Sequence, residues 1–239
     1  MSETHVQDPP RAPSPPPSHD EDLPAPTVLR GVPWSVYVRL RDEPRNHGLR
    51  MTYYDGTLEI MSPAYIHEGP AVRFAGLVRA VARHLGFEYT SSRTTTFRLP
   101  GEGGKKGAGR EPDESFYITS EPLIRGKEKL DLRVDPPPDL WIEVDNRGSS
   151  RGRLPVYARL GVPEVWRYDA RKKTLWFGRR AGETYEAIEH SLCLPILTPA
   201  RTLEALALGK GASDSEWEDR LVAWLGNLPA GGPGRERGA

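Results

Sequence analysis

The chain has almost no cysteine, no long hydrophobic run and no net charge. Its 239 residues include a single cysteine, Cys193, which excludes a disulfide framework and a cysteine-rich zinc site and fits a reducing cytosol. No hydrophobic run is long enough to span a bilayer. The 33 basic and 33 acidic side chains balance, so net charge does not indicate a partner. Because the polar first residues lack the apolar core of a signal peptide, we expect a cytoplasmic protein with no membrane partner.

Composition divides the chain into three parts. Residues 1–27 are polar and proline-rich and cannot bury enough apolar surface to offset the entropy of ordering, so we expect a disordered arm, either a partner ligand or a spacer. Residues 28–226 are long enough to form one sizeable core, and we expect a single domain there. Residues 227–239 are expected to form a flexible tail.

Hydrophobic periodicity predicts a mixed α/β fold, with a central mixed β-sheet flanked by helices and an N-terminal β-hairpin. The turn signal Asp55-Gly56 predicts the hairpin, and the pattern from His67 to Gly86 predicts an amphipathic helix. Further helices are expected from Pro33, at 149–161 and at 213–225, and strands at 88–92, 94–100, 110–118, 140–144, 163–169, 173–180 and 183–189. The glycine- and lysine-rich segment GEGGKKGAG (101–109) is expected to be a mobile loop.

One predicted strand carries carboxylates in an apolar setting. In PPPDLWIEVD, Glu143 lies between Ile142 and Val144, and Asp145 follows. Burying a carboxylate costs several kcal/mol unless it is paired, hydrogen-bonded or bound to a metal. A second acidic stretch, with Asp113 after a proline, opens the preceding strand, and adjacent strands would bring the two together. A hard divalent cation takes such oxygen ligands, and the cost of burying unpaired acids favours a bound cation here.

Six segments carry a resemblance to a known family. They are YYDGTLEIMSP, the HE at the start of the arginine-bearing helix, TTTFR, GREPDESFYI, PPPDLWIEVD and LPVYARLGVPEVWRYD. Through them the chain resembles the PD-(D/E)XK nuclease superfamily, and more closely a bacterial restriction-endonuclease-like family that occurs in many copies per genome. The resemblance covers roughly residues 30 to 200 and implies a restriction-endonuclease-like core.

The resemblance also implies site residues. Asp113 and Glu143 match the positions that bind Mg²⁺ or Mn²⁺, and Asp145 stands where the superfamily usually has a lysine. The displaced basic residue is best matched by Arg153, which can neutralise phosphate charge but cannot act as a general base. Glu68 matches a further acid that some superfamily members place on the preceding helix. The expected catalytic set is therefore Asp113, Glu143, Asp145, Arg153 and Glu68, with metal ligands Asp113, Glu143, Asp145 and Glu68 and with His67 and Glu111 in support.

Each of these residues also has a structural explanation. Asp113 and Asp145 are common in turns, Glu68 favours a helix N-terminus, and the structural alternative for Glu143 is an ion pair with Arg153. Ten basic residues against two acidic ones between Arg147 and Arg180 are typical of a surface that holds a polyanion, although part of this excess is expected to be solvated. The residues expected to contact nucleic acid are Lys105, Lys106, Arg147 and Arg151.

The sequence thus supports a metal-dependent endonuclease acting on nucleic acid, with DNA favoured and a homodimer plausible because related enzymes pair to cut both strands. The alternative is a catalytically degenerate module on the same fold that binds nucleic acid or a protein partner. A hydrolase of small phosphoesters is a third hypothesis, since a fold does not fix a substrate.

Overall fold

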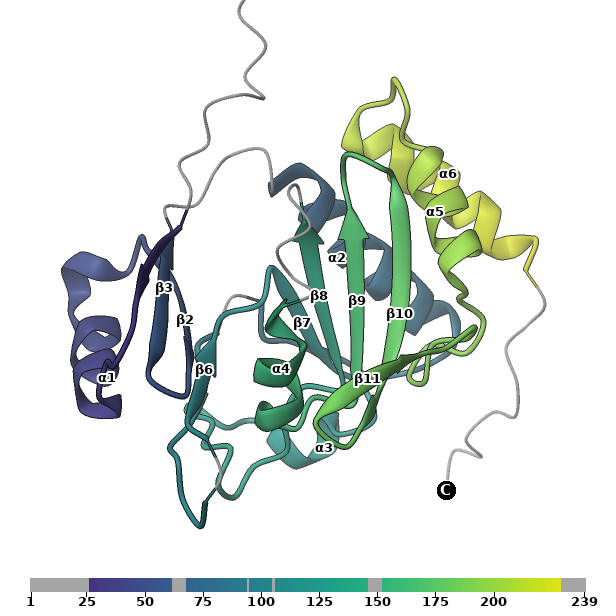
Figure 1. Ribbon diagram of the computed structural model, residues 1–239. Helices are drawn as coiled ribbons and strands as arrows, with labels where there is room; N and C mark the ends of the chain where they lie inside the picture. Colours follow the sequence, from purple (N-terminus) through teal and green to yellow (C-terminus); the bar gives the residue numbers. More distant parts are fainter. Residues whose placement is uncertain (1–25, 62–67, 94, 105, 146–151, 229–239) are drawn as a thin grey trace, which may run out of the picture.

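The computed structural model describes residues 26–61, 68–93, 95–104, 106–145 and 152–228 (Figure 1). The elements, in chain order, are β1 (Thr27–Leu29), α1 (Trp34–Asp42), the 3-10 turn η1 (Pro44–Asn46), β2 (Arg50–Tyr54), β3 (Thr57–Met61), α2 (Glu68–His84), β4 (Thr90–Ser91), β5 (Phe97–Leu99), β6 (Ala108–Arg110), β7 (Glu114–Tyr117), α3 (Glu121–Ile124), β8 (Leu140–Asp145), α4 (Leu154–Leu160), β9 (Glu164–Asp169), β10 (Thr174–Ala181), β11 (Thr184–Ala187), α5 (Pro199–Ala207) and α6 (Asp214–Gly226). None of the helices within these ranges is both long and apolar enough to cross a bilayer.

The strands form two sheets. The five-stranded sheet has the order β1-β3-β2-β6-β5 and is antiparallel, and the six-stranded sheet has the order β11-β10-β9-β8-β7-β4. In the six-stranded sheet β8 and β9 run parallel while the other pairs are antiparallel, and α4 makes the crossover between β8 and β9. The predicted mixed α/β architecture is confirmed, with the expected N-terminal hairpin β2–β3 in the five-stranded sheet.

Local sequence signals explain the main boundaries. Asp55 and Gly56 both have positive φ, 48° and 79°, which is the backbone of the hairpin turn that this dipeptide favours. Gly161 ends α4 at φ 86°, and Pro155 occupies its first turn. Ser213 caps α6 with a capping box to Glu216.

Both faces of the six-stranded sheet are covered. One face packs on α2 and α5, with α6 against α2, and buries Phe74, Val78, Ile142 and Trp166. The other face packs on α4 and buries a second cluster around Trp141. Because β8 is buried along its whole length, its carboxylates require partners within the fold.

Glu164 at the start of β9 supports the fold. Its Oε1 accepts a hydrogen bond from the Trp166 indole at 2.6 Å, and its Oε2 accepts hydrogen bonds from Ser191 Oγ at 3.1 Å and from the Leu192 and Cys193 N–H groups at 2.9 and 3.3 Å. This carboxylate therefore anchors the segment that leads from β11 to α5.

The expectation of a mobile loop at 101–109 is wrong at its end. Residues Ala108–Arg110 form β6, between β2 and β5, and the expected strand 110–118 is divided between the two sheets. Gly109 fits there because the Tyr37 ring lies against its backbone, so close that a Cβ would be 2.6 Å from Tyr37 Cζ. The chain passes from one sheet to the other through Glu111, Pro112 and Asp113.

Candidate functional site

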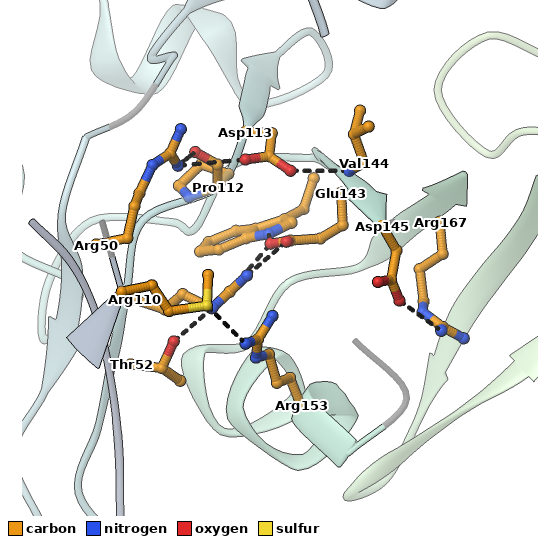
Figure 2. Close-up of polar contacts among 12 residues, drawn as sticks. Arg50, Thr52, Arg110, Pro112, Asp113, Glu143, Val144, Asp145, Arg153 and Arg167 are labelled. Carbon is orange, nitrogen blue, oxygen red and sulfur yellow. Dashed lines mark hydrogen bonds and ion pairs between the residues drawn. The ribbon is translucent and has the colours of Figure 1, made fainter. Parts of the chain in front are cut away.

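The two predicted acidic stretches meet where the sheets adjoin (Figure 2). β7 and β8 are antiparallel neighbours, with Glu114 opposite Ile142. Asp113 comes directly before β7, and its Oδ2 accepts a hydrogen bond from the Val144 N–H of β8 at 2.8 Å. Adjacent strands therefore bring Asp113 beside the Glu143-Val144-Asp145 segment, as the sequence predicted.

Glu143 is held by an arginine that the sequence reasoning missed. It is 2% exposed, and its Oε1 and Oε2 accept hydrogen bonds from Nε and Nη2 of Arg110 at 3.1 and 2.5 Å. Oε1 also accepts a hydrogen bond from the Trp141 indole at 2.5 Å. Burial alone would raise the pKa of Glu143, but the charge and hydrogen bonds of Arg110, together with the Trp141 hydrogen bond and the Arg153 charge, lower it below its ordinary value. Glu143 is therefore a charged carboxylate inside the protein.

Each of the three guanidinium nitrogens of Arg110 donates a hydrogen bond. Its Nη1 donates to Thr52 Oγ1 of β2, and its guanidinium lies 5.7 Å from the centre of the Tyr157 ring on α4. Burial alone would lower its pKa, but the Glu143 carboxylate raises it above the ordinary arginine value. In the sequence, Arg110 is marked only by its position directly before the EPD motif. Its pairing with Glu143 depends on how the two sheets adjoin.

Asp113 is less enclosed than Glu143, with its side chain 15% exposed. Arg50 of β2 lies 3.3 Å from Asp113 Oδ1 and donates to the Pro112 carbonyl oxygen at 2.8 Å (Figure 2). Burial and the nearby Glu143 charge raise the pKa of Asp113. Two carboxylates are thus held close enough together that each disfavours charge on the other.

Asp145 and Arg153 lie at the same end of β8. The Asp145 carboxylate is 3.9 Å from the Arg167 guanidinium of β9. Arg153 precedes α4, where its Nε and Nη2 donate to Glu59 Oε2 at 3.3 and 3.1 Å. The alternative in which Glu143 pairs with Arg153 is wrong, because Arg110 takes that place, although the Arg153 charge helps to lower the pKa of Glu143.

The remaining predicted residues are dispersed or not described. Glu111 is buried and pairs with Arg41 at 3.0 Å and with the Thr96 hydroxyl at 2.6 Å. Lys106 pairs with Asp55 at 3.0 Å on the hairpin. Glu68 begins α2, but its side chain lies outside the described part of the chain, as do the residues His67, Lys105, Arg147 and Arg151.

The carboxylate oxygens at this site are the kind of ligand that suits a hard cation. Mg²⁺ is commonly bound by one or two carboxylates together with water and substrate phosphates. Of about four lone-pair positions on the Glu143 carboxylate, three accept the hydrogen bonds given above, which leaves one on Oε2. The described residues contain no ready-made group of three or more His, Cys, Asp or Glu side chains that could hold a metal. Asp113 and Glu143 are thus the two carboxylates whose chemistry fits a hard cation here.

Comparison with known proteins identifies a family and a similar solved structure. A crystal structure at 1.96 Å resolution of a putative nuclease belonging to DUF820 from Anabaena variabilis ATCC 29413 is similar at 16% sequence identity and a TM-score of 0.40, covering 73% of this chain and 90% of that one. Among proteins with curated descriptions, none matches. The Uma2 family model, described as putative restriction endonuclease, matches residues 34–210, which include β7, β8 and α4. The chain therefore belongs to the Uma2 family of restriction-endonuclease-like proteins.

Proposed function

We propose that the protein is a metal-dependent endonuclease that hydrolyses phosphodiester bonds in nucleic acid, with DNA as the favoured substrate. The observation that carries this proposal is the placement of Asp113 and Glu143 together on adjacent strands, where burial and mutual repulsion raise the pKa of Asp113. Such an arrangement favours a cation between the two carboxylates. Membership of the Uma2 family supports the nuclease class.

Each residue then has a distinct role. Asp113 and Glu143 would hold Mg²⁺ or Mn²⁺, with Asp145 and Glu68 as further candidate ligands. A bound ion supplies Lewis acidity and a lowered pKa of its water. Arg153 would stabilise negative charge on the phosphate, and it cannot serve as a general base because arginine stays protonated.

The test combines metal binding with cleavage. Wild type, Asp113→Asn and Glu143→Ala are titrated with Mg²⁺ or Mn²⁺ by calorimetry, and supercoiled DNA is assayed for nicking in the same samples. Glu114→Gln is the matched control, since this neighbouring buried carboxylate lies on the opposite face of β7, next to Ile142. We expect both variants, but not the control, to lose metal binding and nicking. Failure of the wild type to bind metal would overturn the proposal.

A second function is favoured by one specific observation. The carboxylates of Asp113, Glu143 and Asp145 each lie within 4 Å of an arginine, namely Arg50, Arg110 and Arg167. Such pairing is sufficient for a structural role, and the site would then belong to a module that binds nucleic acid or a protein without chemistry. This alternative predicts that the protein binds nucleic acid or a protein partner even when a chelator is present. It also predicts that Asp113→Asn leaves this binding unchanged. Sedimentation of the DNA complex would show whether a homodimer forms.

A further inference from the structure

A cleft with a volume of about 1410 Å³ lies beside the candidate site. Small-molecule pockets usually measure about 300–1,000 Å³, so this cleft exceeds what a small substrate needs. One wall is formed by α1, the start of β2 and β5, and the other by β4, α3 and the segment 125–133. In Figure 1, α3 is drawn at the lower end of the molecule, beneath α4.

The lining of this cleft is basic although the whole chain is neutral. Its lining residues include seven arginine and lysine side chains and four carboxylates. Three of the seven cations, Arg50, Arg125 and Lys127, pair with carboxylates that do not line the cleft. The seven are Arg41, Arg50, Arg98, Arg125, Lys127, Lys129 and Arg133. Four of them come from the segment 125–133, where the side chains of Arg125 and Arg133 are 61% and 63% exposed. Two of the pairs, Arg98 with Asp42 and Arg133 with Asp131, are exposed on both sides, and such pairs are weak. Arg125 and Lys127 are also exposed, although the carboxylates that they contact are buried.

The cleft also has apolar lining residues. Phe97, Tyr117 and Ile124 are buried, so the half-buried Trp34 is the aromatic lining residue that is open to a base. The Trp34 ring is 5.2 Å from Tyr37 and 5.3 Å from Tyr53, which fixes its orientation. Exposed cations beside an oriented aromatic ring are the combination with which proteins bind single-stranded nucleic acid, with phosphates on the cations and a base on the ring.

Arg50 connects the cleft with the candidate site. It lines the cleft, and its Nη1 is 3.3 Å from the Asp113 carboxylate and 2.8 Å from the Pro112 carbonyl oxygen. Glu111, two residues before Asp113, also lines the cleft. A polymer lying in the cleft would therefore reach Asp113 at the Arg50 end.

We propose that this basic cleft binds a single strand of nucleic acid and directs it to Asp113. The proposed binding of a single strand depends only on the properties of the cleft. The delivery of a phosphate to Asp113 rests on the proposed nuclease function. Single-stranded binding by phosphate contacts is sequence-tolerant and salt-dependent, with a slope of log K against log salt of about −0.7 per phosphate neutralised.

The test is fluorescence anisotropy of a labelled single-stranded oligonucleotide in EDTA. The variant Lys129→Glu/Arg133→Glu reverses two exposed charges on the 125–133 wall, and Lys210→Glu/Arg220→Glu makes the same charge change on exposed residues near α5 and α6, away from the cleft. We expect the cleft variant to bind at least tenfold more weakly, with a salt slope smaller by about 1.4 for two lost contacts. The control should match wild type.

Two results would overturn the proposal. One is that the cleft variant and the control bind the single-stranded oligonucleotide equally well. The other is that the protein binds a duplex competitor more tightly than the single strand, and that the cleft variant keeps this duplex binding. Nicking of supercoiled DNA with Mg²⁺ is measured in parallel. Cleft-dependent binding without any nicking would refute the nuclease function alone, whereas nicking with cleft-independent binding would refute the cleft alone. A 5-bromodeoxyuridine oligonucleotide should crosslink to residues that line the cleft.

Discussion

Replacing Arg110 tests how the protein keeps Glu143 buried and charged. In Arg110→Met, Glu143 loses two hydrogen bonds of 3.1 and 2.5 Å and keeps only the one from the Trp141 indole. Removing one partner of a buried ion pair costs about 3–5 kcal/mol because the other charge stays desolvated. For a domain of this size that corresponds to a fall of about 6–20 °C in Tm.

The assay is urea unfolding followed by tryptophan fluorescence, with Arg98→Met as the matched control. Arg98 makes the same kind of pair with Asp42 at 2.7 Å, but their side chains are 38% and 53% exposed. The control should lose no more than about 1 kcal/mol. The double variant Arg110→Met/Glu143→Met should recover most of the loss, since apolar replacement of a buried pair is often neutral or stabilising.

Added Mn²⁺ connects this prediction with function. If Glu143 binds a cation, the ion compensates its charge in Arg110→Met, so Mn²⁺ should stabilise that variant more than wild type. A loss below about 1 kcal/mol in Arg110→Met would refute the reasoning, because it would mean that Glu143 is neutral or hydrated in the folded protein. A double variant as unstable as the sum of both single variants would refute it as well.

Three further predictions concern the stability and packing of the fold. Gly109→Ala should cost about 3 kcal/mol in the free energy of unfolding, since its Cβ would overlap the Tyr37 ring, whereas Gly48→Ala, with nothing within 4 Å, should be nearly neutral. Burial raises the pKa of Glu164 above its ordinary 4.5, so the folded state holds this proton more tightly, and its contribution to stability should be largest below pH 4.5 and decline as the pH rises. Urea titrations across that range should show the decline in wild type and not in Glu164→Gln. Burial also raises the pKa of the Cys193 thiol, which should react with a thiol reagent only as the protein unfolds.

The sequence predicted the elements that have strong local signals. The Asp55-Gly56 turn, the helix α2 and the crossover helix α4 with its final glycine each follow from residues a few positions apart. β6 was missed because it has three residues, one of them a glycine, and it pairs with strands distant in the sequence. Its place in the sheet depends on tertiary packing against Tyr37, which no local pattern records. The helix α5 was also missed, although Thr198 and Pro199 form a capping signal.

The candidate site was predictable to the extent that it depends on neighbouring strands. Asp113 and Glu143 were expected to meet, and they do. The pairing of Glu143 with Arg110 was not predictable, because it requires knowing that Arg110 belongs to one sheet and Asp113 to the other. The intervening Glu111-Pro112 step carries the chain between the sheets, and it places both residues beside β8 from different directions.

The passage of the chain between the two sheets brings arginines to the carboxylates of β8. The sequence suggested that buried carboxylates need a bound ion, but the fold supplies arginines. Four carboxylates and four arginines pair at the junction of the sheets: Glu59 with Arg153, Asp113 with Arg50, Glu143 with Arg110 and Asp145 with Arg167. The charges of these four pairs balance, so each of the four carboxylates has an arginine partner in the fold itself. A divalent ion would then add two positive charges to these balanced pairs, and an anionic phosphodiester, with one negative charge, would offset part of that excess. Metal and substrate should therefore bind cooperatively, each more tightly in the presence of the other.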